Sequence, residues 1–173
     1  MRRSTIILAL LAATALSGSA LAQMPAAPAA APAGPPAPPA PITAERPAAQ
    51  VELDANRKPI ETMAFAGVKP GMTVAELGPG AGYYTRMLSQ AVGPNGKVLV
   101  VINKAQADRP NGRFTVDGLA SLLPNVQVVV SELNALTLPT APDLVWTTEN
   151  YHDWHNGPTA DIAGLNKSVY AAL

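Results

Sequence analysis

Residues 74–85 read Val74-Ala75-Glu76-Leu77-Gly78-Pro79-Gly80-Ala81-Gly82-Tyr83-Tyr84-Thr85. Three glycines alternate with other residues directly after an apolar segment, which is more glycine than a tight turn requires. Glycine permits a sharp strand-to-helix turn and lets a ligand lie against bare backbone. The N–H groups at the start of the following helix favour a polar or anionic group. The stretch therefore predicts a ligand-binding turn, with a tight turn alone as the alternative.

The spacing of these glycines separates two classes of ligand. A dinucleotide-binding turn has the pattern G-x-G-x-x-G, which requires glycine or alanine at position 83 when counted from Gly78. The chain has Tyr83 there, and counting from Gly80 instead places Thr85 at the third position. A nicotinamide-dependent oxidoreductase is therefore disfavoured and stays as an alternative.

The sequence on either side alternates between strand and helix patterns. Strands are expected at 73–77, 97–102, 126–130 and 143–147, and helices at 83–92, around 114–123 and at 159–173, the last capped by Thr159 with Asp161 in its first turn. An earlier helix, capped by Asp54 or Asn56, should end at Gly67. Short unbroken apolar strands separated by helices indicate a parallel α/β sheet with helices on both faces.

The N-terminus has the features of an export signal. Arg2 and Arg3 precede the apolar run Ile6–Leu16, which is short for a membrane span, and Ala20-Leu21-Ala22 matches a cleavage site. We therefore expect residues 1–22 to be a signal peptide that is removed, which leaves no membrane association. An uncleaved membrane anchor is the alternative. Either way the rest of the protein is expected to be periplasmic or secreted.

Composition divides the remaining chain and excludes several functions. Residues 23–50 are rich in proline and alanine and are expected to be a disordered linker, followed by a domain over residues 51–173. The chain has no cysteine, which excludes disulfides, thiolate metal sites and cysteine nucleophiles. Its 12 basic and 12 acidic residues give no electrostatic footprint for nucleic acid.

The run Glu76-x-Gly78-x-Gly80-x-Gly82 resembles the E/D-x-G-x-G-x-G first motif of class I S-adenosylmethionine-dependent methyltransferases. Residues 69–77 resemble the usual approach to that motif. Residues 143–153 resemble the fourth-strand region of a bacterial group of exported, predicted methyltransferases. The resemblance covers roughly residues 54–173 and implies a Rossmann-like sheet of about seven strands. About four strands are visible, so we expect the chain to be truncated at its C-terminus.

The resemblance also implies a set of cofactor-binding residues. The three glycines of the motif would approach the methionine portion of S-adenosylmethionine, and Glu76 would order the loop. Asn103 stands where the family commonly has an acidic residue for the ribose, although an amide offers only one acceptor. The implied contacts are Glu76, Gly78, Gly80, Gly82, Asn103, Asn134 near the adenine, and Glu149 at the end of the fourth strand, where methyl acceptors are received.

Both histidines of the chain lie in the run Tyr151-His152-Asp153-Trp154-His155. No third ligand with recognisable spacing accompanies them, so a metal site is not predicted. His152 is a candidate general base with Asn150 beside it as a second candidate catalytic residue, because histidine titrates near neutrality. The alternative is a loop that packs its aromatic side chains over the sheet edge.

Three functions follow from these observations. The first is an S-adenosylmethionine-dependent methyltransferase acting on a small-molecule or unknown acceptor. The second is a non-catalytic exported cofactor-binding or interaction module with a relic methyltransferase fold, favoured by Asn103, the leader and the truncation. The third is the nicotinamide oxidoreductase. A four-stranded sheet would leave an unpaired edge near Val145, which favours dimerisation through that edge.

Overall fold

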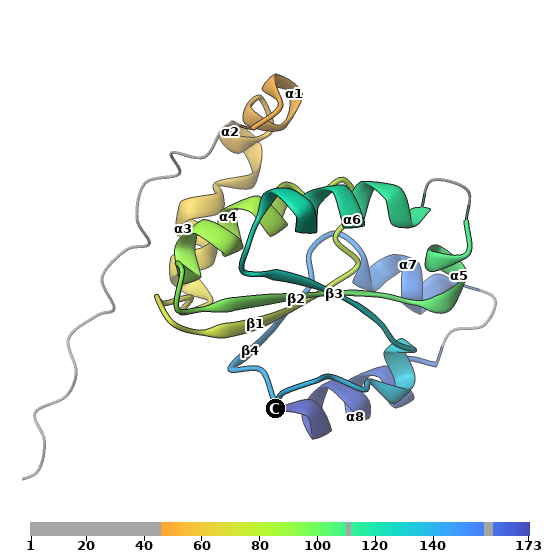
Figure 1. Ribbon diagram of the computed structural model, residues 1–173. Coiled ribbons are helices and arrows are strands. Elements are labelled where there is room, and N and C mark those ends of the chain that lie inside the picture. The colour runs from red at the N-terminus through yellow and green to blue at the C-terminus, as the bar shows by residue number, and fades with distance from the viewer. Residues whose placement is uncertain (1–45, 110–111, 158–160) are drawn as a thin grey trace, which may run out of the picture. The chain divides into compact units, whose positions relative to one another are not determined.

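Four apolar stretches form one sheet in the computed structural model, which describes residues 46–109, 112–157 and 161–173. The strands are β1 (Thr73–Leu77), β2 (Lys97–Ile102), β3 (Val126–Val130) and β4 (Leu144–Trp146). They pair in parallel in the order β3-β2-β1-β4 (Figure 1). The strand order reverses at β1, where β2 lies on one side and β4 on the other. The predicted parallel α/β fold is confirmed.

Helices cover both faces of this sheet (Figure 1). One face is covered by α3 (Pro59–Phe65), α4 (Tyr83–Val92) and α6 (Gly112–Leu122), and the other by the 3-10 turn η1 (Leu133–Ala135) and α8 (Ile162–Ala172). Four short helices complete the described part of the chain: α1 (Ala48–Val51), α2 (Asp54–Arg57), α5 (Lys104–Ala107) and α7 (Tyr151–Asn156).

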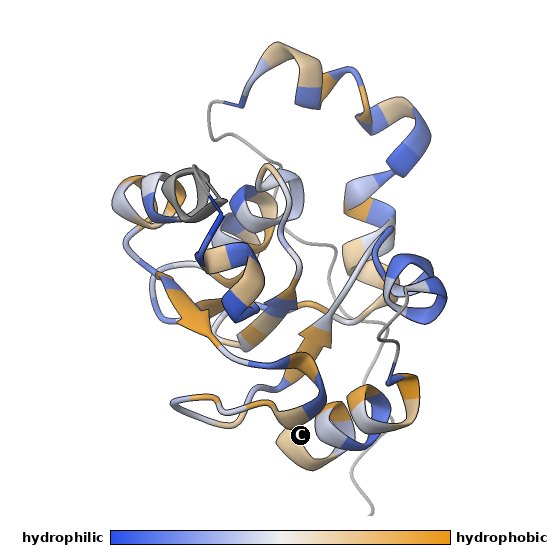
Figure 2. Ribbon diagram, turned by 90° about the vertical axis from the view of Figure 1, so that its right-hand side faces the viewer, coloured by the Kyte–Doolittle hydropathy of each residue, from blue (hydrophilic) through white to orange (hydrophobic). Residues whose placement is uncertain are grey.

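Alternation along the strands divides the core between the two faces. On β1, Val74 packs under α4 whereas Ala75 and Leu77 pack under α8. The strand β2 is buried at five of its six positions, as expected for a strand covered on both sides. Figure 2 shows the result: the strands are largely hydrophobic, and the surrounding helices carry both hydrophobic and hydrophilic residues.

Most predicted elements are confirmed, and three need correction. The helix expected after Asp54 is divided in two, because Lys58 adopts a left-handed conformation with φ of 44° between α2 and α3. The aromatic–histidine run forms the helix α7, not a loop. Asp161 is the N-cap of α8, its side chain accepting from the Gly164 N–H, whereas Thr159 lies outside the described residues.

The predicted leader and most of the predicted linker lie outside the described residues, so export and cleavage stay predictions. Arg46 and Gln50, which precede the predicted domain boundary at Val51, already contact the domain. Among the helices that the structure describes, none is long and apolar enough to cross a membrane. The described sheet ends at β4 on one side, and dimerisation through this edge stays a prediction.

Candidate functional site

The glycine loop joins β1 to α4. Three alternate residues of this loop, Gly78, Gly80 and Gly82, have positive φ angles. Gly82, with φ of 76°, is the N-cap of α4, and a Cβ placed there would lie 2.1 Å from Leu119 Cδ1. Gly80, with φ of 56°, is exposed, and a Cβ there would meet no atom within 4 Å among the described residues. Gly82 is thus required for packing, whereas Gly80 leaves open space beside bare backbone.

Glu76 is the acidic residue that precedes this loop, and it lies at the face of β1 that packs under α4. Its side chain is 3% exposed and accepts a hydrogen bond of 2.6 Å from Thr85 Oγ1 on α4. Burial raises the pKa of the Glu76 carboxyl to about 7, and the hydrogen bond from Thr85 offsets part of that rise. The site therefore has, beside the loop, a carboxyl group whose pKa lies near neutral pH.

A cavity of about 300 Å³ opens above the loop, at the carboxyl ends of β1 and β4. In open α/β sheets, ligands bind at the point where the strand order reverses, which in this sheet is β1. One wall is the glycine loop with Glu76, and a second comprises Trp146, Thr148, Glu149 and Asn150. The third wall comes from the N-terminal strap, which we define as residues 46–57.

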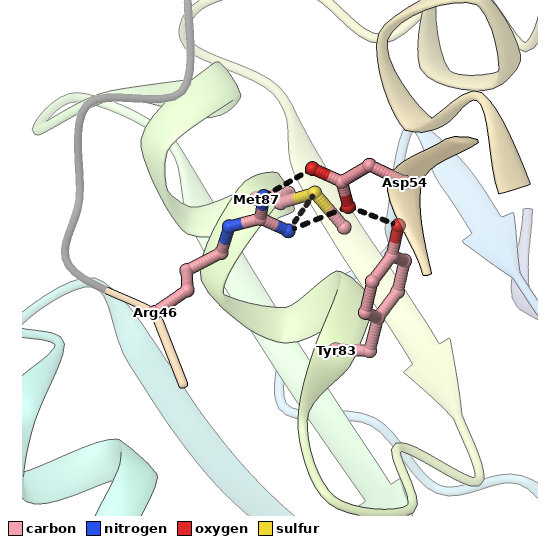
Figure 3. Close-up of polar contacts among 4 residues, drawn as sticks. All are labelled: Arg46, Asp54, Tyr83 and Met87. Atoms are coloured by element: carbon pink, nitrogen blue, oxygen red, sulfur yellow. Dashed lines mark hydrogen bonds and ion pairs between the residues drawn. The ribbon is translucent and has the colours of Figure 1, made fainter. Parts of the chain in front are cut away.

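The N-terminal strap is tied to α4 by one ionic cluster (Figure 3). Asp54 pairs with the Arg46 guanidinium and accepts a hydrogen bond of 2.6 Å from the Tyr83 hydroxyl. Arg46 also contacts Met87 Sδ at 3.3 Å. The hydrogen bond from Arg46 lowers the pKa of the Asp54 carboxyl, despite partial burial. These contacts hold the strap in place as the cover of the cavity.

Two further contacts close the strap over the loop. Gln50 Nε2 donates a hydrogen bond of 3.1 Å to the Ala81 carbonyl oxygen. Arg57 pairs with the Glu149 carboxylate, and its guanidinium lies 4.6 Å from the centre of the Tyr83 ring. Glu149 adopts a left-handed φ of 58°, which is unusual for a residue other than glycine. Strap, loop and β4 thus meet around one cavity.

A second cavity, of about 240 Å³, contains the two asparagines predicted for the nucleoside end. Asn103 caps α5: its Oδ1 accepts from the Gln106 N–H at 2.7 Å, in a reciprocal capping box. Asn134 Nδ2 donates to Asp161 at 3.1 Å. The structure therefore brings both residues together beside α8, with Asn103 Oδ1 already engaged in a local hydrogen bond.

The two candidate catalytic residues occupy different surroundings. Asn150 Nδ2 donates a hydrogen bond of 2.7 Å to the Gly78 carbonyl oxygen, so it fastens the end of β4 to the glycine loop. His152 lies on α7 with its side chain 67% exposed and pairs with the neighbouring Asp153, and it lines neither cavity. Within the described residues, no three His, Asp or Glu side chains are grouped to hold a metal ion.

The family described as protein-L-isoaspartate(D-aspartate) O-methyltransferase (PCMT) matches residues 44–142, which is more than half of the chain. The chain belongs to the PCMT family. This membership confirms the predicted class I methyltransferase relationship, and the predicted cofactor class, S-adenosylmethionine, agrees with it.

Solved structures add to the family match. A SAM-dependent methyltransferase from Aquifex aeolicus is 26% identical, with a TM-score of 0.52 over 73% of this chain and 66% of that protein. A cyclopropane-fatty-acyl-phospholipid synthase-like protein from Lactobacillus casei is 22% identical, with a TM-score of 0.52 over 73% of this chain and 49% of that one, which shows the fold. The chain thus spans two thirds or less of these proteins. No curated protein matches it.

Sequence reasoning missed three of the residues that form the main cavity. Gln50 lies in the stretch assigned to the linker, and Arg57 lies in no motif. Trp146 lies in the run 143–153 that resembles a methyltransferase fourth strand, but no role was predicted for it. The register places Trp146 beside Glu76 on the neighbouring strand, which the sequence could have indicated only if the strand pairing were known. By contrast, the capping role of Asn103 could have been predicted from the sequence, because Asn103 and Gln106 have the spacing of a capping box.

Proposed function

We propose that this PCMT-family chain binds S-adenosylmethionine at the carboxyl edge of its sheet and acts as an S-adenosylmethionine-dependent methyltransferase on a small-molecule or still unidentified acceptor. The observation that carries the proposal is the open backbone at Gly80 inside a cavity at the reversal of strand order. Such a cavity is where open α/β sheets receive ligands.

The residues present fit the methionine end of this cofactor. Glu76 supplies a carboxylate beside the loop, and the loop supplies close access to backbone at Gly80. Within the described ranges, two buried polar atoms that belong to residues lining this cavity have no hydrogen-bond partner, Gln50 Oε1 and Trp146 Nε1. A cavity that is bordered by an unsatisfied acceptor and an unsatisfied donor suits a polar ligand group.

The nucleoside end would be held in the second cavity. Asn134 and Asn103 line it, together with the carboxylates of Glu132 and Asp153. Because Asn103 Oδ1 already caps α5, a carboxylate in this cavity is better placed to accept from ribose hydroxyls. The site residues named from the sequence thus remain proposals, with Asn103 the least available of them.

The cofactor supplies a methyl group on a sulfonium centre, and transfer of such a group depends mainly on positioning. In this chain the strap forms one wall of the cavity through Gln50, Leu53 and Arg57. Glu149 and Thr148 lie at its far end, and an adjoining cavity of about 420 Å³ is lined by them together with Asn56 and Tyr84. We propose this adjoining cavity as the place that receives the acceptor.

Calorimetric titration of the purified chain with S-adenosylhomocysteine tests the cofactor site. We expect micromolar binding, with no binding of NADH. The Gly80→Val variant should lose binding of S-adenosylhomocysteine, because the added side chain would fill the open space beside the loop. In addition, φ of 56° strains a β-branched residue.

Gly71→Val provides a matched control. Gly71 also has positive φ, 86°, and open space around it, but it lies at the opposite end of β1. This variant should carry similar backbone strain and retain binding. A folded wild-type chain that does not bind S-adenosylhomocysteine would overturn the proposed function.

A further inference from the structure

The main cavity contains a buried acceptor and a buried donor that no described residue satisfies. Gln50 is 9% exposed and Trp146 is 5% exposed, and both line the cavity. The unpartnered atoms are Gln50 Oε1 and Trp146 Nε1. Leaving such an atom buried without a partner is unfavourable, so native proteins seldom retain one without a reason.

Both side chains are fixed, so neither can turn to find another partner. Gln50 Nε2 donates to the Ala81 carbonyl, which sets the orientation of the amide and leaves Oε1 as the free end. Trp146 packs against the Tyr84 ring at 4.9 Å between ring centres. Trp146 also pairs in register with Glu76, so the two side chains extend from adjacent strands on the same face of the sheet.

Gln50 Oε1, the Glu76 carboxylate and Trp146 Nε1 together suit a ligand that carries both an ammonium group and a carboxylate. An ammonium group needs acceptors, which Gln50 Oε1 and the Glu76 carboxylate provide. A carboxylate needs donors, which the Trp146 indole N–H provides. The α-amino acid end of a ligand carries both groups on one carbon, whereas a nucleoside end carries neither.

We propose that Gln50 and Trp146 recognise the amino-acid end of the bound ligand, with Gln50 Oε1 accepting from its ammonium group and Trp146 Nε1 donating to its carboxylate. The inference rests on the proposed function and adds two specificity residues from outside the glycine motif. It also gives the strap a binding role, because Gln50 lies on α1 and reaches the ligand only while the strap covers the loop.

Two ligands separate this role from a structural one. S-adenosylhomocysteine has the amino-acid end, and 5′-methylthioadenosine lacks it. Trp146→Phe removes the indole N–H and keeps an aromatic ring. Gln50→Leu removes Oε1 together with the Nε2 that donates to the Ala81 carbonyl, so its effect on binding includes any loosening of the strap. Each variant should bind S-adenosylhomocysteine about 10-fold to 100-fold more weakly, as expected for loss of one hydrogen bond to a charged group. Binding of 5′-methylthioadenosine should not change.

The stability of the free protein gives a second readout. Trp146→Phe removes an unsatisfied buried donor but also leaves a small cavity in the core, so its thermal unfolding midpoint should fall modestly while the transition stays cooperative. Gln127→Leu, at an exposed position on β3, is the matched control for the glutamine substitution and should bind both ligands as the wild type does.

The outcomes are distinct. Equal weakening of both ligands would show a structural role, and unchanged affinity for both would show that neither atom contacts the ligand. Either result would overturn the inference while the proposed function stands. A folded wild-type chain that binds 5′-methylthioadenosine as tightly as S-adenosylhomocysteine would also overturn it. Absence of any binding to the wild type would instead overturn the proposed function and this inference with it.

Discussion

The Glu76 carboxyl is the most unusual ionisable group that the structure describes. It is buried between β1 and α4, where it accepts a hydrogen bond from the hydroxyl of Thr85. No described cation compensates its charge, which is why burial raises its pKa to about 7. A residue of this kind destabilises the folded state when ionised, and a ligand ammonium group would relieve that cost.

The sign of the resulting pH dependence follows from the direction of the shift. The folded pKa lies above the ordinary value of 4.5, so the folded state holds the proton more tightly than the unfolded state does. Stability is therefore highest below pH 4.5 as far as this group is concerned, and it is lost as pH rises through 7. A shift of this size corresponds to about 3 kcal/mol at full ionisation.

Glu76→Gln should remove this pH dependence. The amide keeps the shape of the side chain and an acceptor for Thr85, but it cannot ionise. We expect the variant to be more stable than the wild type at pH 8, by at most about 3 kcal/mol, and equally stable near pH 4.5. Urea unfolding at several pH values measures the difference. Glu61→Gln, exposed on α3, is the charge control, and parallel stability curves for Glu76→Gln and wild type would contradict the prediction.

At the scale of single residues, the sequence indicated the part of the site that is local in the chain. Glu76 and the three glycines stand at every second position, so their spacing in the sequence alone identifies the motif. Gln50 and Trp146 reach the same cavity from positions far apart in the sequence. Only the parallel pairing of β1 with β4 and the docking of the strap bring them to the loop.

The break between α2 and α3 shows how one residue alters an element. Lys58 has φ of 44° and ψ of 58°, so it ends α2 and begins a new helix at Pro59. Pro59 cannot supply an N–H to a continuing helix and disfavours helical backbone at the residue before it. The sequence pattern predicts one helix in this region with Pro59 in its first turn, whereas the structure has a separate short helix before Lys58.

Lys58→Gly should stabilise the fold. Glycine adopts the left-handed conformation without a Cβ clash, and relief of that clash is worth about 1 kcal/mol. Lys58→Ala removes the same charge but keeps the clash, so it should leave stability nearly unchanged. Chemical denaturation at neutral pH distinguishes the two variants. A Lys58→Gly variant no more stable than Lys58→Ala would show that the left-handed conformation is not strained.

The elements that the sequence predicted best are those formed by uninterrupted runs between clear turn residues. The strands β2 and β3 and the helix α4 match their expected ranges, because continuous apolar runs and flanking turn residues mark their ends. By contrast, α7 has two histidines and an exposed tyrosine, and it begins two residues after Glu149, which has a positive φ. Its helical form depends on packing of Trp154 against the sheet, which periodicity does not reveal.

At the scale of the whole domain, the strap connects the beginning of the described chain to the end of β4. Asp54 ties it to α4, and Arg57 ties it to Glu149 across the cavity. The strap contributes few residues to the hydrophobic clusters, so polar contacts supply much of its attachment. Segments held in this way open with a smaller free energy than the core does.

Asp54→Asn should therefore loosen the strap without unfolding the domain. The amide loses the ionic attraction to Arg46 and one of the two acceptor oxygens that Arg46 and Tyr83 use. Hydrogen exchange of the strap amides, such as the Arg57 N–H that bonds to the Leu53 carbonyl, should become about 10-fold faster or more. Acid should act in the same direction in the wild type, because the lowered pKa of Asp54 means that its ion pair is lost as pH falls through that pKa.

Ligand binding and strap closure should then be coupled. If Gln50 contacts the ligand only in the closed form, S-adenosylhomocysteine must slow exchange in the strap of the wild type, and Asp54→Asn must bind it more weakly. Exchange in β2 should stay the same in both proteins, since this strand is buried between the helical layers. Equal strap exchange with and without bound S-adenosylhomocysteine would show that the strap is static, and that Gln50 does not depend on closure to reach the ligand.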